Sequence, residues 1–562
     1  MPSSSVCPRL HTLISRFASV LFIGTVMLGG LFLGTPTASA SSTSYSGVTK
    51  GTLAAAGTVD LRRLPPGKAF QPAAHRHSPG VRRVPRRGSP TQLTRPAATS
   101  SSVDAGHTGA LLSNFNGVSS LDSAVTNFGA EFEPPDQGLC VGNGFVLEAV
   151  NSAFTIYHTD GSVVTGPFNV NVLFDEGLAE FTSDPRCYYD KSTNTWFAVI
   201  LFINSTNTEA RTDLAVNTSG DPTTSWTEYR LDATDDGSNG TPSHPGCPCL
   251  GDQPLLGIDQ QNVYISTNEF SILGPQFNGA QIYPVSKSDL VALSSTIHFV
   301  HFENLSVGGA IAASVQPAIT NGKADAEYFL NSLDPFGTFD DRLGVWALTN
   351  RDAVSHGGIP NLSSVVITSE PYGVPPKAIQ QGATSLLDAG DDRMQQVQFI
   401  NGDLWGALDT AVTIPNDTAP RAGLAWFEVH PHLKGAIIGG AQLKRQGYVT
   451  SLGNYLLYPA IQVDRQGTAA MVMTLSGPTF FPSAAYTVLS AGHKSFGDIH
   501  VAAPGTGPYD PTATRWGDYS WAVLDPNHNN IWMATEYIPP LSSQTPDGLR
   551  NWGTRVFEVA AN

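Results

Sequence analysis

The sequence predicts an all-β protein, a seven-bladed β-propeller, from three observations. Glycine and proline are abundant, at 55 and 40 of 562 residues, and no long segment has apolar residues at helical spacing. Short apolar stretches that alternate at period two are bounded by turn sequences. A unit of roughly 40 to 60 residues with this plan occurs seven times. A β-sandwich joined to a second β domain is the alternative, but sandwiches do not repeat at this period.

The last unit, residues 515–537, shows the plan most clearly. It begins with a polar corner, RWGD, and continues into an alternating strand at 519–524. Aspartate, proline and asparagine at 525–530 predict a turn, because these residues favour reversal of the backbone. An aromatic-rich strand at 531–537 returns beside the first, so this unit is predicted to contain a β-hairpin.

The other units have the same order of a polar loop bearing aspartate, a strand, a turn and a return strand. In chain order the seven units are marked by residues 134–138, 183–186, 251–254, 312–350, 391–393, 458–490 and 515–537. Asp160-Gly161 in the first unit is a typical hairpin turn. Loops on one face of a propeller converge on its axis, so we expect the aspartate-bearing loops to share one mouth.

The residues before the repeats predict export. Residues 1–40 have a positive start, an apolar stretch at 17–33 and the small residues Ala38-Ser39-Ala40, which is typical of a cleaved signal peptide. Secretion is therefore predicted, with a retained N-terminal membrane anchor as the alternative. Residues 41–110 are rich in Ser, Thr, Ala, Pro and Arg, so we expect a disordered basic linker or pro-region. The propeller domain is predicted to span 111–562.

The charge distribution bears on partners. The chain has a formal net charge of −16, yet residues 61–100 contain nine Lys and Arg and no acidic residue. An acidic body repels nucleic acid, so nucleic-acid binding is not expected. We expect a monomer without stable membrane insertion, whose partner is an extracellular glycan or surface polymer.

Several short motifs resemble those of a known family. These are PPD at 134–136, SDP at 183–185, GDQP at 251–254 and RWGDYS at 515–520. Together they resemble a family of secreted bacterial proteins related to the sialidase-like β-propellers, over about 115–560. The resemblance implies fold and export but no agreed activity. True sialidases carry an arginine triad and Ser-x-Asp-x-Gly-x-x-Trp boxes, and the nearest match here, residues 219–226, lacks the central glycine.

Five aspartates that head different units are the candidate catalytic residues: Asp136, Asp184, Asp252, Asp392 and Asp518. Glycoside hydrolysis needs one carboxyl group kept protonated and a second kept ionised, and crowded carboxylates beside arginines can supply both states. The alternative is that each aspartate accepts backbone N–H bonds and stabilises a turn.

The candidate substrate-binding residues are Arg186, Arg393, Arg515, Trp516, Tyr519 and Glu536. Residues 515–519 are the densest cluster: the two aromatic rings could stack on a sugar, and Arg515 with Asp518 could bind its hydroxyls. In the alternative interpretation the Arg–Asp pair joins the last blade to the first, and Trp516 lies in the core.

No cofactor or metal site is predicted. The oxygen-rich stretch 232–240 leaves Ca²⁺ binding as an alternative, although it lacks the spacing of a dedicated loop. The histidines show no zinc spacing beyond His430 and His432, which we expect at the surface. After loss of Cys7 with the signal, four cysteines remain, Cys140, Cys187, Cys247 and Cys249, so disulfides are plausible. A Cys140–Cys187 bond would join the first two blades, and a Cys247–Cys249 bond would be strained, so pairing elsewhere stays open.

The leading hypothesis is a secreted propeller that engages extracellular glycan as a sialidase-like glycoside hydrolase with paired carboxylates. The competing hypothesis is a non-catalytic binding or adhesion propeller that recognises a polysaccharide or a protein.

Overall fold

Antiparallel strands joined by short turns make up most of the computed structural model, with 54% of residues in strands and 6% in helices. The structure describes residues 42–64, 93–104, 111–130, 132–333, 335, 337–509, 515–545 and 550–560. The chain has two units, residues 1–39 and 40–562, and the described residues all belong to the second. The prediction of an all-β protein is confirmed.

The strands form successive groups, in each of which neighbours in the group are hydrogen-bonded. The first contains β6 (Gly138–Gly142), β7 (Phe145–Ala149), β8 (Ala153–His158) and β9 (Val163–Asn169). The second contains β10 (Phe181–Asp190), β11 (Thr195–Ile203), β12 (Ala210–Asn217), β13 (Ser225–Asp232) and β3 (Ala55–Asp60). The third contains β14 (Cys249–Ile258), β15 (Asn262–Ser271), β16 (Phe277–Ser286), β17 (Ile297–Phe302) and β2 (Val48–Leu53).

The later groups follow the same plan. The fourth contains β20 (Gln316–Asn321), β21 (Glu327–Ser332), β22 (Asp340–Thr349), β23 (Asn361–Tyr372) and β1 (Thr43–Ser44). The fifth contains β24 (Val397–Ile400), β25 (Asp403–Val412), β26 (Arg421–Lys434) and β27 (Ile437–Val449). The sixth contains β28 (Tyr455–Val463), β29 (Ala469–Gly477), β30 (Phe480–Leu489), β31 (Ile499–Ala503) and β4 (Val103–Asp104). The seventh contains β32 (Trp521–Leu524), β33 (Ile531–Tyr537), β34 (Gly553–Val559) and β5 (Leu111–Ser119).

The remaining elements are short. They are the α-helices α1 (Ser120–Thr126) and α2 (Lys287–Val291), the strands β18 (Ser306–Val307) and β19 (Ala310–Ile311), and the 3₁₀ turns η1 (Leu61–Arg63), η2 (Val170–Phe174), η3 (Arg351–His356) and η4 (Leu541–Ser543). In the described parts of the chain, no helix is long and apolar enough to cross a membrane.

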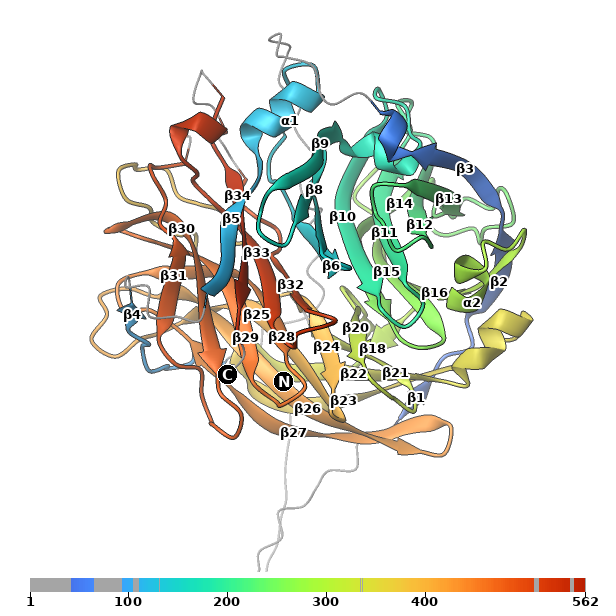
Figure 1. Cartoon of the computed structure of the whole chain (residues 1–562). Helices are drawn as coiled ribbons and strands as arrows, with labels where there is room; N and C mark the ends of the chain where they lie inside the picture. Colours follow the sequence, from blue (N-terminus) through green and yellow to red (C-terminus); the bar gives the residue numbers. More distant parts are fainter. Residues whose placement is uncertain are drawn as a thin grey trace, which may run out of the picture. The chain divides into compact units, whose positions relative to one another are not determined.

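The first strands of the groups neighbour one another in a closed cycle: β6, β10, β14, β20, β24, β28, β32 and back to β6. Parallel pairing of β14 with β20 and of β20 with β24 merges the third, fourth and fifth groups into one sheet. The seventh group is completed by β5, which comes from the beginning of the domain and pairs with β34 near the chain's end (Figure 1). A circular arrangement of this kind leaves few exposed strand edges.

Turn chemistry explains where the strands reverse. Asp160-Gly161 connects β8 to β9, as predicted: Gly161 has φ of 87°, and Asp160 Oδ1 accepts the N–H of Ser162 at 2.9 Å. Asn401-Gly402, between β24 and β25, has φ of 55° and 89°, which suits the tight turn of a two-residue hairpin. The predicted hairpin of the last unit is also present, as β32 and β33.

Indole side chains fill the core. Eight tryptophans are among the largest fully buried side chains: Trp196, Trp226, Trp346, Trp426, Trp516, Trp521, Trp532 and Trp552. Cys140 on β6 is bonded to Cys187 on β10, so the pairing that joins the first two groups is confirmed. Cys247 and Cys249 are bonded to each other.

The prediction of disorder for residues 41–110 is wrong for part of this segment. β2 and β3 pair with β17 and β13 along six and five residues, and β1 pairs with β23, so each lies at the outer edge of a group (Figure 1). Outer strands are held by backbone hydrogen bonds to an otherwise unpaired edge, so they need little apolar patterning of their own. The remainder of the predicted linker, 65–92 and 105–110, and the predicted signal peptide, 1–40, lie outside the described residues.

Candidate functional site

Three of the first strands contain the same kind of β-bulge, in which a residue with positive φ is followed by proline. These pairs are 184–185 (Asp-Pro) in β10, 253–254 (Gln-Pro) in β14 and 458–459 (Tyr-Pro) in β28, with φ of 59°, 52° and 53° at the first residue. In each strand the pairing register shifts at this point. Proline has no N–H for the ladder, and a bulge re-aims the adjacent side chain. The side chains of Asp184, Gln253 and Tyr458 thereby meet residues of other groups.

A cavity of about 190 Å³ lies where these first strands come together. Its walls carry three carboxylates, two guanidinium groups, two amides and one phenol, and they are formed by Gln253, Asp388, Gly390, Asp391, Arg393, Gln395, Tyr458, Arg515 and Asp518. The hydroxyl of Tyr458 is buried and has no hydrogen-bond partner among the described residues. Gly390 and Gly517 leave room for the phenol ring, because a Cβ at either position would lie 3.0 Å or 2.5 Å from it.

Arg393 is held from two sides. Its Nε and Nη2 donate to Asp391 at 2.8 and 2.7 Å, and its Nη1 donates to Gln253 Oε1. The side chain is 4% exposed, so this bidentate pair is almost completely removed from water. Arg393 therefore presents a guanidinium group of defined orientation at the cavity wall.

Asp518 forms an ion pair with Arg515 Nη2 at the same wall. Burial raises the pKa of Asp518, Arg515 opposes this effect, and the nearby Asp184 adds to it, so the pKa lies above the usual aspartate range. A carboxyl group in this environment can hold a proton at a pH where an exposed aspartate is ionised.

Behind the cavity wall, Asp136 and Asp184 form a carboxyl pair joined by a side-chain hydrogen bond. Asn151 contacts both: its Nδ2 donates to Asp136 Oδ2 at 2.7 Å, and its Oδ1 accepts the backbone N–H of Asp184 at 2.7 Å. Burial raises the pKa of both carboxyl groups, and the charges of Asp518 and Asp184 raise that of Asp136 further. Two buried carboxyl groups in direct contact favour sharing a proton, so they titrate as a pair.

Arg186 lies beside this pair, with its guanidinium carbon 3.0 Å from the ring centroid of Tyr519 and 4.7 Å from that of Trp521. Tyr519 in turn donates from its hydroxyl to the backbone oxygen of Pro185 at 3.1 Å. Arg186 and Tyr519 are buried and do not form the cavity wall. They hold β10 against the segment that precedes β32.

The structure separates the eleven predicted site residues into three sets. Asp518, Arg393 and Arg515 line the cavity. Asp136, Asp184, Arg186 and Tyr519 form the layer behind it. Asp252, Asp392, Trp516 and Glu536 are buried positions that are absent from the wall.

The third set differs from the sequence prediction for identifiable reasons. Trp516 is fully buried and packs against Tyr509 at 4.8 Å, so its ring lies in the core rather than open to a sugar. Glu536 Oε2 accepts the N–H of Gly517 at 2.6 Å and so stabilises the turn. At the fifth group, Asp391 rather than Asp392 is paired with Arg393 and lines the cavity.

Six cavity residues were not predicted: Gln253, Asp388, Gly390, Asp391, Gln395 and Tyr458. One sequence signal could have identified two of them, because Gln253 and Tyr458 precede proline as Asp184 does. Asp388 and Gln395 carry no comparable signal.

The stretch 232–240 does not assemble its carboxylates into a calcium loop. Asp232 accepts hydrogen bonds from the N–H of Thr234 at 2.9 Å and from Asn239 Nδ2 at 2.9 Å, and Asp236 accepts one from the N–H of Ser238 at 2.8 Å. These carboxylates stabilise turns within the loop. The rings of His430 and His432 meet edge-on with their centroids 4.7 Å apart. His430 Nδ1 is hydrogen-bonded to Asp403 Oδ1.

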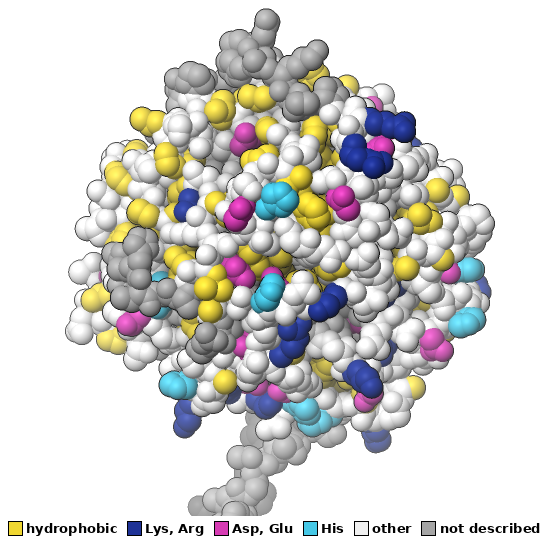
Figure 2. Space-filling view, viewed as in Figure 1, with side chains coloured by type: hydrophobic (Ala, Val, Ile, Leu, Met, Phe, Trp, Pro, Cys, Tyr) yellow, Lys and Arg dark blue, Asp and Glu magenta, His cyan; other side chains and the backbone are white. Residues whose placement is uncertain are grey.

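On the face shown in Figure 2, acidic, basic and hydrophobic side chains are interspersed, and no single kind covers the face.

No protein-family model and no curated protein matches the chain. Similar solved structures include the N-terminal domain of Nup159, with 9% identity, a TM-score of 0.33, and coverage of 83% of this chain and 100% of that chain. Trypanosoma rangeli sialidase is similar with 8% identity, a TM-score of 0.32, and coverage of 76% and 58%. The α-L-arabinofuranosidase Arb93A of Fusarium graminearum is similar with 10% identity, a TM-score of 0.31, and coverage of 80% and 98%. These matches carry no information about activity, because one fold hosts many unrelated functions.

Proposed function

We propose that this chain is a secreted, seven-bladed β-propeller that engages extracellular glycan and holds a sugar residue in its central cavity. The closed cycle of first strands supports the ring, with each group of strands as one blade. The two disulfides suit an oxidising, extracellular environment.

The observation that carries the proposal is the convergence of carboxylates, guanidinium groups and amides on one cavity. Sugar hydroxyls both donate and accept hydrogen bonds, so they match a wall that offers Asp388 and Asp391 as acceptors and Arg393 and Arg515 as donors. At about 190 Å³ the cavity is smaller than the pockets that enclose drug-sized ligands, so it suits a single sugar unit.

A specific observation favours glycoside hydrolysis over binding alone. Asp518 has a raised pKa and can serve as the general acid. Asp388 lies at the same cavity, has no ion pair among the described residues, and accepts the N–H groups of Ala389 and Gly390 at 3.0 and 3.4 Å. Its place at the cavity makes it the candidate for the second carboxylate of a two-carboxylate mechanism. The non-catalytic alternative is that both arginines and their aspartates only hold the sugar.

The purified protein should be screened on a panel of immobilised glycans for retention and, with the same glycans in solution, for release of sugar. Asp518→Asn should abolish release while retention persists. Arg393→Lys should weaken retention, because lysine cannot make the bidentate pair with Asp391 that orients the cation at the cavity wall. Glu209→Gln, at a half-exposed position outside the cavity, is the matched control. Retention without release would identify a binding propeller. The proposal would be refuted if the protein showed no retention on any glycan and no release of sugar.

A further inference from the structure

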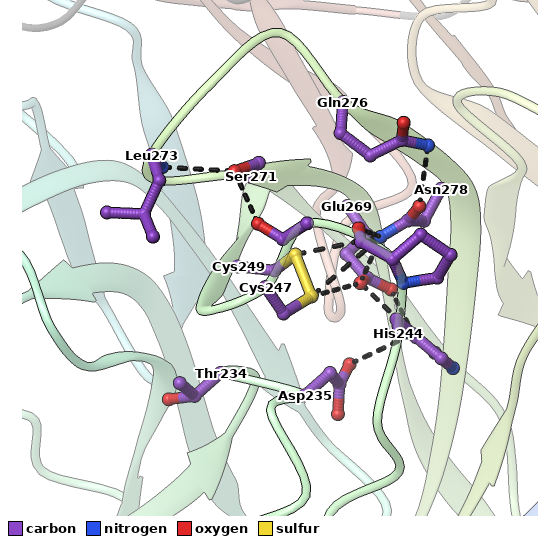
Figure 3. Close-up of a disulfide and its surroundings, with 12 residues drawn as sticks. Thr234, Asp235, His244, Cys247, Cys249, Glu269, Ser271, Leu273, Gln276 and Asn278 are labelled. Atoms are coloured by element: carbon purple, nitrogen blue, oxygen red, sulfur yellow. Dashed lines mark hydrogen bonds and ion pairs between the residues drawn. A yellow bond between two sulfur atoms is a disulfide. The ribbon is translucent and has the colours of Figure 1, made fainter.

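Residues far apart in the sequence assemble a second polar cluster in the third group of strands, and it shares no residue with the central cavity (Figure 3). Asp235 and His244 come from the loop between β13 and β14, and Glu269 comes from β15. One ligand atom from each of the three lies within 4.8 Å of the others. Glu303, just after β17, contacts the same imidazole from the other side.

His244 has the surroundings of a metal-binding imidazole. Its Nδ1 lies 2.8 and 3.0 Å from the two carboxylate oxygens of Glu269 and 3.9 Å from Asp235 Oδ2. Its Nε2 lies 2.6 Å from Glu303 Oε2. Histidines that bind metals almost always donate their other ring N–H to a carboxylate or carbonyl group, which orients the ring and raises its basicity.

Glu269 is positioned by amides. Gln281 Nε2 donates to its Oε2 at 2.6 Å and Asn278 Nδ2 donates to its Oε1 at 2.9 Å, and the side chain is 1% exposed. Such bonds to a ligating carboxylate are typical of the groups that surround a metal centre.

Asp235 is a buried carboxylate whose own oxygen atoms lack hydrogen-bond partners in the described chain. Its side chain is 1% exposed, and neither carboxylate oxygen has a hydrogen-bond partner among the described residues. Figure 3 shows this carboxylate directed toward His244. Burying an unsatisfied carboxylate is costly, so a group of this kind indicates a missing counter-charge or ligand.

We propose that Asp235, His244 and Glu269 bind one divalent transition-metal ion, with Zn²⁺ as the best match. An imidazole nitrogen with two carboxylates suits zinc, whereas Ca²⁺ and Mg²⁺ favour oxygen ligands alone. Tetrahedral zinc with ordinary bond lengths separates its ligand atoms by about 3.3 Å. The distances from His244 Nδ1, 2.8 to 3.9 Å, bracket this value. Three protein ligands leave a fourth position for water or another ligand.

The Cys247–Cys249 disulfide lies against this site, with Cys247 Sγ 3.2 Å from Glu269 Oε1. A disulfide sulfur is a poor zinc ligand compared with a thiolate, so the oxidised protein should bind zinc through nitrogen and oxygen alone. Metal binding must therefore be measured with the disulfides intact, because reduction would add two thiolates beside Glu269.

The test is titration of the chelator-treated, disulfide-intact protein with Zn²⁺ against a competing zinc indicator, together with the ratio of bound metal to chain. One tight ion per chain is expected. Asp235→Asn preserves shape and should lower zinc affinity by at least about 100-fold, and Glu303→Gln, at a positioning residue, should lower it about 10- to 100-fold. Thermal melts without metal show whether each variant folds.

Asp289→Asn is the matched control. Asp289 Oδ2 lies 2.8 Å from His298 Nδ1, which is the same kind of carboxylate–imidazole pair, but no third ligand is grouped with it in the described chain. This variant should keep the zinc affinity of the unaltered protein. Zinc should also raise the melting temperature of the unaltered protein and of Asp289→Asn but not that of Asp235→Asn. Absence of a one-to-one ion, or equal affinity in Asp235→Asn and the unaltered protein, would overturn the proposal.

Discussion

The guanidinium group of Arg186 lies over the ring of Tyr519, 3.0 Å from its centroid, and so joins β10 to the segment that precedes β32, which is distant in sequence. Asp184, two residues before Arg186, belongs to the carboxyl pair beneath the cavity. This contact thus couples the closure of the fold to the geometry of the candidate site.

Arg186→Ala should lower the free energy of unfolding by roughly 3 to 5 kcal/mol, because it removes the main positive charge that acts on the buried carboxyl group of Asp184. Urea denaturation measures this loss. Arg230→Ala removes a partly exposed ion pair with Glu176 and should cost at most about 1 kcal/mol. Equal midpoints for the two variants would contradict the role given to Arg186.

Glu148 should make the protein more stable in mild acid. Burial raises the pKa of Glu148 to about 7, although Thr554 and the Val118 N–H donate to its carboxylate. The folded state therefore holds a proton that the unfolded chain releases near pH 4.5. The stabilisation of the folded state by Glu148 is fully present below that pH and is lost as the pH rises through 7.

Between pH 5 and 8 the free energy of unfolding of the unaltered protein should therefore fall by roughly 3 kcal/mol more than that of Glu148→Gln. Denaturation curves at several pH values measure the difference in slope. Glu209→Gln, at an exposed carboxylate, should retain the slope of the unaltered protein. Parallel pH profiles for the unaltered protein and Glu148→Gln would show that Glu148 is ionised throughout.

Tyr458→Phe should weaken sugar binding about tenfold without loss of stability. The hydroxyl group at the cavity is buried with no partner in the described chain, so it is available to a ligand and its removal leaves no group unsatisfied. Tyr229 also has a buried hydroxyl without a partner among the described residues, but it lies away from the cavity. Tyr229→Phe should therefore leave glycan retention unchanged, and a comparable loss in both variants would contradict the prediction.

The two disulfides should differ in their effect on stability. The Cys140–Cys187 bond closes a loop with a sequence separation of 47, so replacing both residues with alanine should cost roughly 4 kcal/mol. The same relation gives roughly 1 kcal/mol for Cys247–Cys249, whose separation is 2. Thermal unfolding of the two double-alanine variants compares them, and the opposite order would refute the expectation.

The N-terminal strands should be structural rather than a dispensable arm. A Cβ at Gly51, on β2, would lie 2.6 Å from the ring of Phe299 on β17, so Gly51→Val should disturb this pairing, lower the melting temperature and promote aggregation through the uncovered edge. Thr52→Val, at the adjacent exposed position, is the control and should be neutral. Light scattering during a thermal ramp detects both effects.

The sequence by itself determined the class of fold and the repeated unit. Alternating apolar residues and turns such as Asp160-Gly161 act between neighbours in the chain, so their outcome does not depend on distant contacts. The Cys140–Cys187 bond was also foreseeable, because it joins consecutive units.

Only the tertiary structure decided which polar groups face the cavity. The bulges at 184–185, 253–254 and 458–459 re-aim side chains by a change in φ, and whether Asp391 or Asp392 reaches the wall depends on one residue of register. Asp235, His244 and Glu269 likewise converge because a loop folds back onto β15. Local patterns specify strands and turns, whereas the meeting of side chains depends on how the ring of sheets closes.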